Sequence, residues 1–484
     1  MSDYRDLLEK CEADVRSGQA HLAARRIGEV SLARLPRELR LPLANVCRRA
    51  QLISLGLKIL APAIHPESRL DRPATSAECA EYAVLLTRLG AIEEALSYLD
   101  RADERDVREV RLYKAFCRFN RWEYAAALPD LERYLAADLE PYQRLIGRVN
   151  LAACQVALRH FAEAEALLTE NISLARDGSF ARLQGNCHEL RAQVHLLTGK
   201  AEKAKRDLDR AAKLLGSEKT FDELFVRKWR AVLESQESDS TEPLEKFKVE
   251  ALSRNDSESL READYFSLKI RMEEERFQHL LFGTPFEGYR ARIVEDLGRA
   301  VTTRFYRYGS RGLTAPVLDV SSGVAIGCAS LPAGSKLHQV FGALLKDFYR
   351  PVRLGGLFAE LFPGEAFNAF SSPDRVYQLL YRARSWLVQA DAPVTITAKH
   401  GLFKLHVHGD FSFRVPLERS PLDEESLRLT KLRQTFKWEF TADEACSRLA
   451  LSRSAFKRLA ARSLSEGKLE RMGAARAIRY RFRA

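Results

Sequence analysis

Arg375, Gln378 and Arg382, together with Tyr381, lie three or four residues apart near the end of the chain. This spacing places their side chains on one face of a helix. The forked donors of Arg match the edge of guanine in the DNA major groove, and the paired donor and acceptor of Gln match adenine. The set therefore predicts a helix that reads base edges.

A second set of polar residues follows further along the chain. Ser454, Lys457 and Arg458 have the spacing of another base-reading helix, and Arg462 lies on the same outward face. We expect four further cations, in segments that predict β-hairpins, to hold backbone phosphates: Lys404, Arg471, Arg476 and Arg479.

Short strands and helices are expected to position the first set. Residues 317–320 and 323–327 alternate β-branched with small residues, which predicts two strands. Apolar residues at helical spacing predict helices at 335–349 and 354–361, and Ser372 with Pro373 is typical of the start of a third helix. Its inward face would carry Val376, Leu379, Leu380, Ala383 and Leu387.

A β-hairpin is predicted after this helix. Residues 394–397 and 403–407 alternate as strands do, and 399–401 form the turn between them. Phe305 to Tyr308 is open to two interpretations, either a further strand of the same sheet or a basic aromatic patch that touches the DNA backbone, and we favour the strand.

The order of strands, three helices and a hairpin resembles the winged-helix effector domain of the OmpR/PhoB response regulators. The similarity rests on residues 382–387, near the end of that family's recognition helix, and on residues 401–405, near its hairpin. It implies a DNA-binding domain at 316–420. Nothing upstream resembles the family's receiver domain, so the resemblance implies no phosphorelay control.

Residues 421–484 predict a second, shorter unit of the same kind. A helix is expected at 422–436, and Thr441 with Glu444 has the spacing of a capping box. Ser452 would cap a third helix that ends near Gly467, and a hairpin would follow at 468–482. This part resembles a generic winged helix-turn-helix.

The distribution of charge supports a partner that is a polyanion. The chain has a net charge of +11, and residues 301–484 contain 29 Lys and Arg against 16 Asp and Glu. Residues 1–300 contain 48 against 50. The excess of positive charge thus belongs to the part that predicts winged helices, as binding to phosphates requires.

The first 234 residues predict amphipathic helices that repeat. Similar turns precede Ala95, Ala125, Ala164 and Ala204, at steps close to the 34 residues of the tetratricopeptide repeat. Residues 18–30 are a candidate for an earlier repeat. The pattern resembles a degenerate tetratricopeptide solenoid, whose concave surface would hold a protein or peptide. A plain helical bundle without a ligand is the alternative.

The polar stretch at 235–243 predicts an exposed linker, followed by more helix to about Phe282. We therefore expect four parts: helical repeats at 1–234, a linker and connecting helices at 235–315, and winged helices at 316–420 and 421–484. The role of residues 283–315 is not evident from the sequence.

Signatures of enzymes and of metal sites are weak. The chain has no P-loop, no H-E-x-x-H and no G-x-S-x-G motif, and Ser454 with Lys457 matches S-x-x-K without the companion motifs. His400, His406 and His408 with Asp410 could hold a metal, but hairpin histidines are more often ordinary surface residues. We expect no catalysis, no cofactor and no metal.

The expected compartment is the cytoplasm. Eight Cys stand singly without a C-x-x-C, as in a reducing environment, and no apolar run approaches the length of a membrane span. The N-terminus has no apolar signal segment.

The sequence thus predicts a mainly α protein, with an N-terminal α-α solenoid and two C-terminal α+β winged helices. The favoured function is a transcriptional regulator that binds double-stranded DNA and a protein partner. The alternative is a scaffold whose winged helices dock proteins. The DNA target, the direction of regulation, the partner and the oligomeric state are not contained in the sequence.

Overall fold

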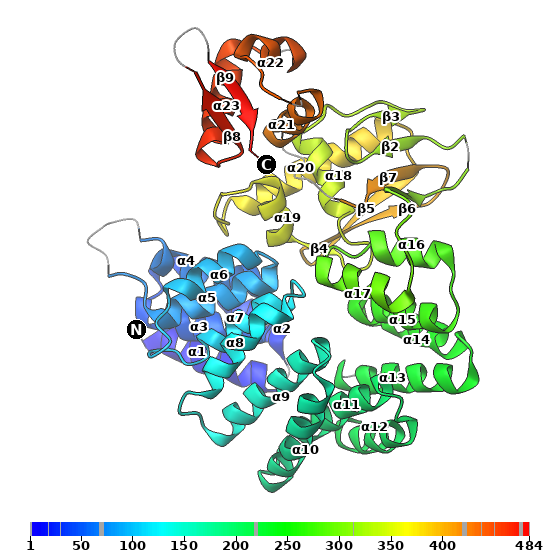
Figure 1. Cartoon of the computed structure of the whole chain (residues 1–484). Coiled ribbons are helices and arrows are strands. Elements are labelled where there is room, and N and C mark those ends of the chain that lie inside the picture. Colours follow the sequence, from blue (N-terminus) through cyan, green and yellow to red (C-terminus); the bar gives the residue numbers. More distant parts are fainter. Residues whose placement is uncertain are drawn as a thin grey trace. The chain divides into compact units, whose positions relative to one another are not determined.

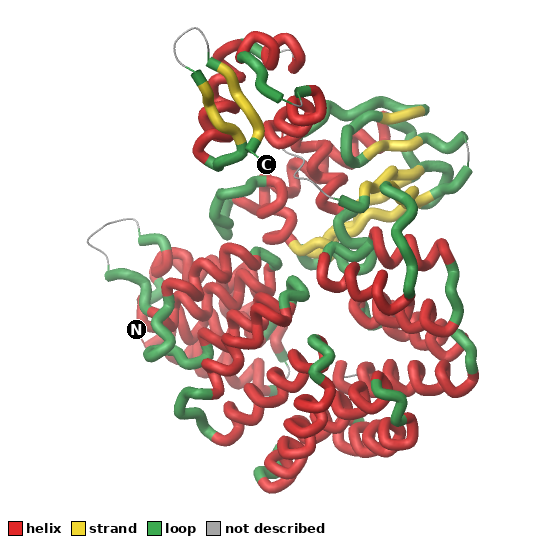
Figure 2. The backbone as a smooth tube through the Cα atoms, viewed as in Figure 1, coloured by secondary structure: helices red, strands yellow, loops and turns green. Residues whose placement is uncertain are grey.

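The computed structural model describes residues 2–17, 19–29, 31–66, 72–216, 221–312, 314–418, 424–436, 438–449, 451–473 and 478–483 of the 484-residue chain. These residues form two compact units. The first contains Met1–Thr302, Lys346–Tyr377 and Thr397–Lys404, and the second contains Thr303–Leu345, Gln378–Ile396 and Leu405–Ala484. The described strands all lie after residue 304, as Figure 2 shows.

The first unit is built from helix pairs that follow one another along the chain, coloured blue to green in Figure 1. A 3₁₀ turn, Leu32–Arg34, precedes the second pair. The pairs are α1 (Ser2–Arg16) with α2 (Ala20–Gly28), α3 (Arg37–Arg49) with α4 (Ile53–Ile64), α5 (Ser76–Leu89) with α6 (Ile92–Arg101), α7 (Val110–Phe119) with α8 (Tyr124–Leu135), α9 (Pro141–Ala157) with α10 (Phe161–Asp177), α11 (Ala181–Leu197) with α12 (Ala201–Leu215), α13 (Phe221–Ser238) with α14 (Glu242–Ser253), and α15 (Ser257–Ile270) with α16 (Glu274–Phe282).

Each pair packs internally and against its neighbours, so the helices form an α-α solenoid. The first helices α3, α5 and α7 lie side by side, and so do α9, α11, α13 and α15. Stacking is required because one amphipathic pair cannot bury its own apolar face. The predicted solenoid is confirmed, and the 1–234 boundary is too short because two more pairs continue it.

Six of the described turns within the pairs share one geometry, and those at Gln51 and Asp239 have φ of +63° and +48°. In the other four, Gly90, Trp122, Arg159 and Gly199 each adopt positive φ, between +63° and +94°. The next residue then donates its N–H to the carbonyl five positions back, as Lys200 does to His195 at 2.7 Å. These caps reverse the chain between the first and the second helix of these pairs.

In four of these pairs, the buried alanine of the second helix lies five residues after the left-handed residue. Ala95, Ala127, Ala164 and Ala204 are fully buried, whereas Ala125 is exposed. The predicted position of the second repeat was therefore wrong by two residues. Its turn has no glycine to mark the left-handed position, which Trp122 occupies.

The expected linker at 235–243 is also wrong. Helix α13 continues to Ser238, Asp239 turns the chain at φ +48°, and α14 begins at Glu242. Ser235 is fully buried, because this polar stretch is the end of a packed helix. The polar composition of this stretch reflects the residues that face solvent on a helix, and it does not indicate an extended linker.

Three further elements after α16 lie wholly in the first unit. They are α17 (Glu287–Leu297), β4 (Val352–Arg353) and α19 (Leu354–Leu361). Strand β4 pairs antiparallel with β6 (Leu402–Val407) through Val352 with Phe403 and Arg353 with Leu402. Helix α19 has the predicted bounds.

The second unit contains a four-stranded sheet in the order β1-β7-β2-β3. The strands are β1 (Phe305–Gly309), β2 (Val317–Asp319), β3 (Ala325–Ile326) and β7 (Ser412–Pro416). Strand β7 pairs antiparallel with β1 and parallel with β2. Residues 305–308 are therefore in a strand, as we favoured.

One helix packs on this sheet through aromatic rings, and a second helix packs on the first. They are α18 (Lys336–Leu344) and the later part of α20 (Ser372–Gln389). Phe341 of α18 lies 5.8 Å from Phe413 of β7 and 5.3 Å from Trp386 of α20, measured between ring centroids. Helix α18 ends at Leu344, five residues before the predicted end.

The predicted hairpin is present as β5 (Val394–Lys399) and β6. His400 and Gly401 both adopt positive φ in its turn, as a two-residue hairpin turn requires. The predicted strands, helices and hairpin thus occur in the expected order, and β4 and β7 are two strands that the sequence did not predict.

Residues 424–483 fold around their own apolar core. The elements are α21 (Glu424–Thr435), α22 (Ala442–Leu449), α23 (Arg453–Ser465), β8 (Leu469–Met472) and β9 (Arg479–Phe482). Leu432, Phe440, Phe456 and Leu459 are buried in the core. The predicted capping box is present, because Thr441 N donates to Glu444 Oε2 at 2.7 Å and Glu444 N to Thr441 Oγ1 at 3.3 Å.

The described helices are each too short or too polar to cross a lipid bilayer.

Candidate functional site

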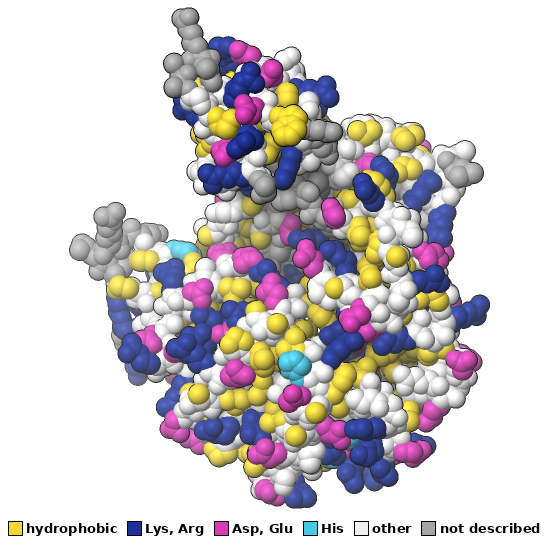
Figure 3. All heavy atoms as spheres, in the orientation of Figure 1, with side chains coloured by type: hydrophobic (Ala, Val, Ile, Leu, Met, Phe, Trp, Pro, Cys, Tyr) yellow, Lys and Arg dark blue, Asp and Glu magenta, His cyan; other side chains and the backbone are white. Residues whose placement is uncertain are grey.

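Helix α23 separates apolar from polar side chains along its length. Phe456, Leu459 and Ala460 are buried, and the residue types on the opposite face are polar or cationic. The predicted residues Ser454, Lys457, Arg458 and Arg462 are all exposed there. Lys and Arg side chains are prominent on the visible face of this module in Figure 3, with Asp and Glu among them.

Some of these exposed residues already have partners within the helix. Ser454 Oγ lies 3.0 Å from Ser452 Oγ, and Arg462 Nε lies 2.8 Å from Glu466 Oε1. A surface pair of this kind is weak, so Arg462 can leave it at little cost. Lys457 and Arg458 point into solvent beside each other in the sequence.

The hairpin β8–β9 does not gather its arginines on one surface. Arg471 pairs with Tyr480 in the register, so it shares the face of Leu469 and Phe482. Arg479 and Arg481 lie on the other face, where Arg481 pairs with Glu470. The predicted phosphate contacts Arg471 and Arg479 therefore face opposite ways, and Arg476 lies outside the described residues.

Arg479 also acts on the start of α22. Hydrogen bonds from Thr441 hold the pKa of Glu444 below its usual value, and the charge of Arg479 contributes to this. The hairpin face of Arg479 thus lies near the first turn of α22.

Helix α20 has the predicted inward face, with Val376, Leu380, Ala383 and Leu387 buried and Leu379 nearly so. Gln378, Tyr381 and Arg382 are exposed, as expected, and Tyr381 retains 71% of its accessible surface. The same exposed surface includes Val388 at 80%. Base reading accounts for an exposed Gln or Arg but not for this Val.

Arg375 is placed differently from the expectation. Its guanidinium forms two hydrogen bonds with the carboxylate of Glu365, at 2.6 and 3.1 Å, and lies 3.8 Å from the ring centre of Phe362. An Arg held by a bidentate carboxylate and an aromatic face is committed within the protein. The assignment of Arg375 to base reading is not supported by this geometry.

Lys404 is also turned inward. The side chain is half-buried, and Nζ donates to the carbonyl of Tyr349 at 3.2 Å. Loss of water around the ammonium lowers the pKa of Lys404. The expected contact of Lys404 with a phosphate is therefore corrected, because hairpin position alone did not show which way the side chain points.

The solenoid carries contacts that the sequence reasoning missed. Trp122, at the α7–α8 turn, stacks on Tyr289 of α17 with ring centroids 4.6 Å apart and an interplanar angle of 11°. The guanidinium of Arg292, also from α17, lies 4.6 Å from the centre of the Trp122 ring, and Arg159 pairs with Asp296. Helix α17 is thus fixed to two consecutive turns of the solenoid.

A third turn holds α19. Gly355 approaches so closely that a Cβ there would lie 3.0 Å from the Leu89 carbonyl oxygen, and a Cβ on Gly90 would lie 2.9 Å from Arg353 Cβ. Glu94 of α6 accepts a hydrogen bond from the Phe367 backbone at 2.9 Å. The turns at Gly90, Trp122 and Arg159 therefore all bind later segments of the same unit.

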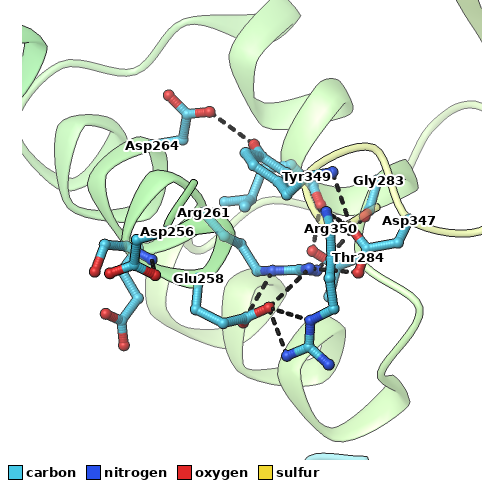
Figure 4. Close-up of polar contacts among 12 residues, drawn as sticks. Asp256, Glu258, Arg261, Asp264, Gly283, Thr284, Asp347, Tyr349 and Arg350 are labelled. Atoms are coloured by element: carbon cyan, nitrogen blue, oxygen red, sulfur yellow. Dashed lines mark hydrogen bonds and ion pairs between the residues drawn. The ribbon is translucent and has the colours of Figure 1, made fainter. Parts of the chain in front are cut away.

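Arg261 joins α15 to the segment that precedes β4. Its side chain is fully buried, and Nη2 lies 2.6 Å from Asp347 Oδ2 (Figure 4). Burial acts to lower the pKa of Arg261, but the charges of Asp347 and Glu258 outweigh it and raise that pKa. The network continues through Arg350, which lies 2.7 Å from Glu258.

Asp347 also binds the backbone after it. Its Oδ1 accepts hydrogen bonds from the N–H groups of Tyr349 and Arg350, both at 2.9 Å, and Tyr349 OH donates to Asp264 at 2.7 Å (Figure 4). A single Arg in an amphipathic helix is usually solvated, so this network was not expected. The signal that could have found it is that Arg261 shares a helical face with Tyr265 and Leu268, which are buried.

In the described ranges, no group of three or more His, Cys, Asp or Glu side chains is arranged to hold a metal ion. Near the β5–β6 hairpin, His408 Nε2 lies 2.7 Å from Thr395 Oγ1.

Comparison with solved structures finds helical repeat proteins. A tetratricopeptide repeat protein from Parabacteroides merdae ATCC 43184 is 17% identical over 58% of this chain and 98% of its own, with a TM-score of 0.37. A Rap protein in complex with Competence and Sporulation Factor is 11% identical over 61% of this chain and 89% of its own, with a TM-score of 0.44. The apo form of RapI is 12% identical over 60% and 86%, with a TM-score of 0.40. No protein-family model and no curated protein sequence matches the chain.

Proposed function

We propose that this chain is a non-enzymatic regulator in which residues 424–483 form a winged helix that binds duplex DNA and the solenoid binds a protein or peptide. The observation that carries the DNA-binding half is the outward face of α23, where Lys457 and Arg458 are exposed above a buried apolar core. Such a helix can enter a major groove without losing any contact that holds the module together.

In this proposal α23 is the recognition helix and β8–β9 is the wing. Ser454, Lys457 and Arg458 meet base edges, and Arg462 leaves its exposed pair with Glu466 to reach a phosphate. Arg479 supplies a second phosphate contact from the wing. Arg471, on the opposite face of the hairpin, contributes to the positive potential without touching the same strand.

Residues 303–418 have a different role in the proposal. Their element order supports a winged helix like that of the OmpR/PhoB effector domain, but Arg375 and Lys404 are held by protein groups. Gln378, Tyr381 and Arg382 remain outward for DNA. We therefore assign the first winged helix a secondary contribution to DNA affinity.

Salt dependence of binding tests the proposal. The full chain is titrated into a fluorescent duplex of about 30 base pairs of mixed sequence, between about 50 and 300 mM KCl. Phosphate contacts from Arg462 and Arg479 predict that log K falls with log salt at a slope of about −1.8 or steeper, and Arg479→Ala makes this slope shallower by about 0.9 for every duplex. The double variant Lys457→Ala/Arg458→Ala instead reduces discrimination between duplex sequences.

Lys246→Ala is the matched control, because it removes an exposed cation from α14, 75% exposed and paired with Glu242. It leaves the slope unchanged. Failure of the full chain to bind duplex DNA at about 50 mM salt would refute the DNA-binding half, as would equal losses in Arg479→Ala and Lys246→Ala.

A scaffold without DNA binding is the second candidate. It is favoured by the contacts that α19 makes with the α5–α6 turn and that Arg375 makes with Glu365, since residues held by protein contacts are not free to read DNA. The scaffold predicts weak binding to all duplexes alike, abolished by modest salt, together with retained binding of a protein to the solenoid.

A further inference from the structure

Four arginines form a row across the first unit, which we define as the arginine row: Arg48, Arg88, Arg353 and Arg350. Arg48 comes from α3 and Arg88 from α5, while Arg353 precedes α19 and Arg350 lies just upstream of β4. The row therefore combines the solenoid with the segment that docks on it. Arg353 can lie against the α5–α6 turn because Gly90 has no side chain there.

The two outer members of the row have carboxylate partners. Arg48 Nε lies 2.7 Å from Glu81 Oε1, and Arg350 Nη2 lies 2.7 Å from Glu258 Oε1. These two acids neutralise the ends of the row. They also hold both guanidinium groups in place, because charge-assisted hydrogen bonds fix geometry.

The two inner members have none. Among the described residues, neither Arg88 nor Arg353 forms an ion pair with a carboxylate, and both side chains are exposed. Arg353 Nη1 instead donates to the backbone carbonyl of Arg88 at 3.1 Å. This contact brings the cationic head of Arg353 to the end of α5 and leaves its other N–H groups for a further acceptor.

The electrostatics agree with an excess of positive charge at this place. Partial loss of water around the guanidinium lowers the pKa of Arg353, and the like charges of Arg350 and Arg88 lower it further. Partial burial and the charge of Arg48 lower the pKa of Arg88, and Glu81, which is paired with Arg48, offsets this in part. Like charges that are held together without ion-pair partners of their own are relieved when an anion binds between them.

Tyr113 of α7 adds an aromatic surface beside the row. It is half-buried, and the charges of Glu109, Arg48 and Glu81 act on it. An extended peptide that crosses α5 and α7 therefore meets an aromatic ring near Arg48, at one end of the row.

We infer that Arg88 and Arg353 bind the carboxylate groups of an acidic peptide segment, presented by a protein partner of the solenoid. The inference rests on the proposed protein-binding role of the solenoid and is independent of DNA binding by residues 424–483. A carboxylate shared by both arginines bridges α5 to the start of α19, so the partner also strengthens the docking of α19.

The test measures binding of a fluorescein-labelled peptide with alternating Glu and Gly, amidated at its C-terminus, to the full chain at about 75 mM KCl, where surface charges are only partly screened. Arg88→Gln and Arg353→Gln each weaken binding about tenfold or more, since each removes a charge-assisted contact. The control Arg206→Gln/Arg210→Gln removes two exposed cations from α12 and leaves the affinity essentially unchanged.

Peptide binding that is unaffected by Arg88→Gln and Arg353→Gln would overturn the inference, as would no binding by the wild-type chain. Displacement of the peptide by inorganic phosphate at an equal concentration of charge would show a site for small anions and would also overturn it. Duplex binding separates this inference from the proposed function: Arg88→Gln leaves DNA affinity intact, and a parallel loss would place the row in a DNA interface instead.

Hydrogen exchange of residues 354–361, measured in parallel, separates loss of contact from loss of folding at this junction. Protection equal to wild type in Arg88→Gln, combined with loss of peptide binding, supports direct contact. If peptide binding is lost only to the extent that α19 loses its protection from exchange, the result contradicts direct contact.

Discussion

Gly90→Ala isolates the contact between the α5–α6 turn and α19. Gly90 adopts φ +94°, a region in which alanine costs about 1 kcal/mol. The added Cβ would also lie 2.9 Å from Arg353 Cβ and 3.2 Å from the Gly356 backbone nitrogen. Overpacking of this kind costs about 1–3 kcal/mol. The total is therefore about 2–4 kcal/mol.

Gly199→Ala is the matched control. Gly199 occupies the equivalent turn between α11 and α12, at φ +72°, and nothing lies within 4 Å of the position that an added Cβ would take. It carries only the backbone cost of about 1 kcal/mol. The difference between the two variants thus measures the contact with residues 353–356.

The rates of amide hydrogen exchange in the full chain measure this difference in stability at individual helices. In Gly90→Ala, amides of residues 354–361 exchange roughly 5- to 150-fold faster, which corresponds to about 1–3 kcal/mol of lost local stability. In Gly199→Ala these amides are unchanged, and only those of α11 and α12 are affected. Equal exchange of residues 354–361 in both variants would refute the packing of α19 on the solenoid turn.

Two further outcomes follow from buried charges. Asp347→Asn leaves Arg261 buried with only Glu258 as a charged partner and lowers the free energy of unfolding by about 3–5 kcal/mol. Arg261→Met/Asp347→Asn costs less, because the fully buried cation is removed and Glu258 keeps Arg350 as its partner. Urea unfolding that ranks the double variant as less stable than Asp347→Asn would contradict this account. Burial raises the pKa of Glu189 to about 7, so the stability that its protonated form provides is complete below about pH 4 and is lost as pH rises through 7. The free energy of unfolding of Glu189→Gln therefore matches that of wild type near pH 5 and exceeds it by at most about 3 kcal/mol at about pH 8. A difference in unfolding free energy that does not change with pH would show that Glu189 is ionised throughout.

The local elements of this chain could be predicted because neighbouring residues specify them. Thr441 and Glu444 form their capping box from side chains three residues apart, and His400–Gly401 supplies both positive φ angles of a hairpin turn. The inward face of α20 followed from apolar spacing alone. Helical repeats were also evident, because stacking requires the same small and large residues in every pair.

The predictions from sequence were wrong where a local pattern is compatible with two different structures. Trp122 takes the left-handed position that Gly90 and Gly199 occupy in two other turns, so the buried alanine of this repeat is Ala127 and not Ala125. The polar run near Ser235 is helix because its neighbours bury one side of it. Neither outcome is visible without the surrounding helices.

The sequence by itself determined which residues carry charge and which helix face they occupy, since both depend on residue type and on a period of about 3.6. Only the tertiary structure decided what those charges meet. Arg375 and Arg382 are alike in sequence, yet Glu365 and Phe362 hold the first and solvent surrounds the second. Arg88 and Arg353 are 265 residues apart and come together because two glycine-containing backbones approach closely, a contact that no local pattern encodes.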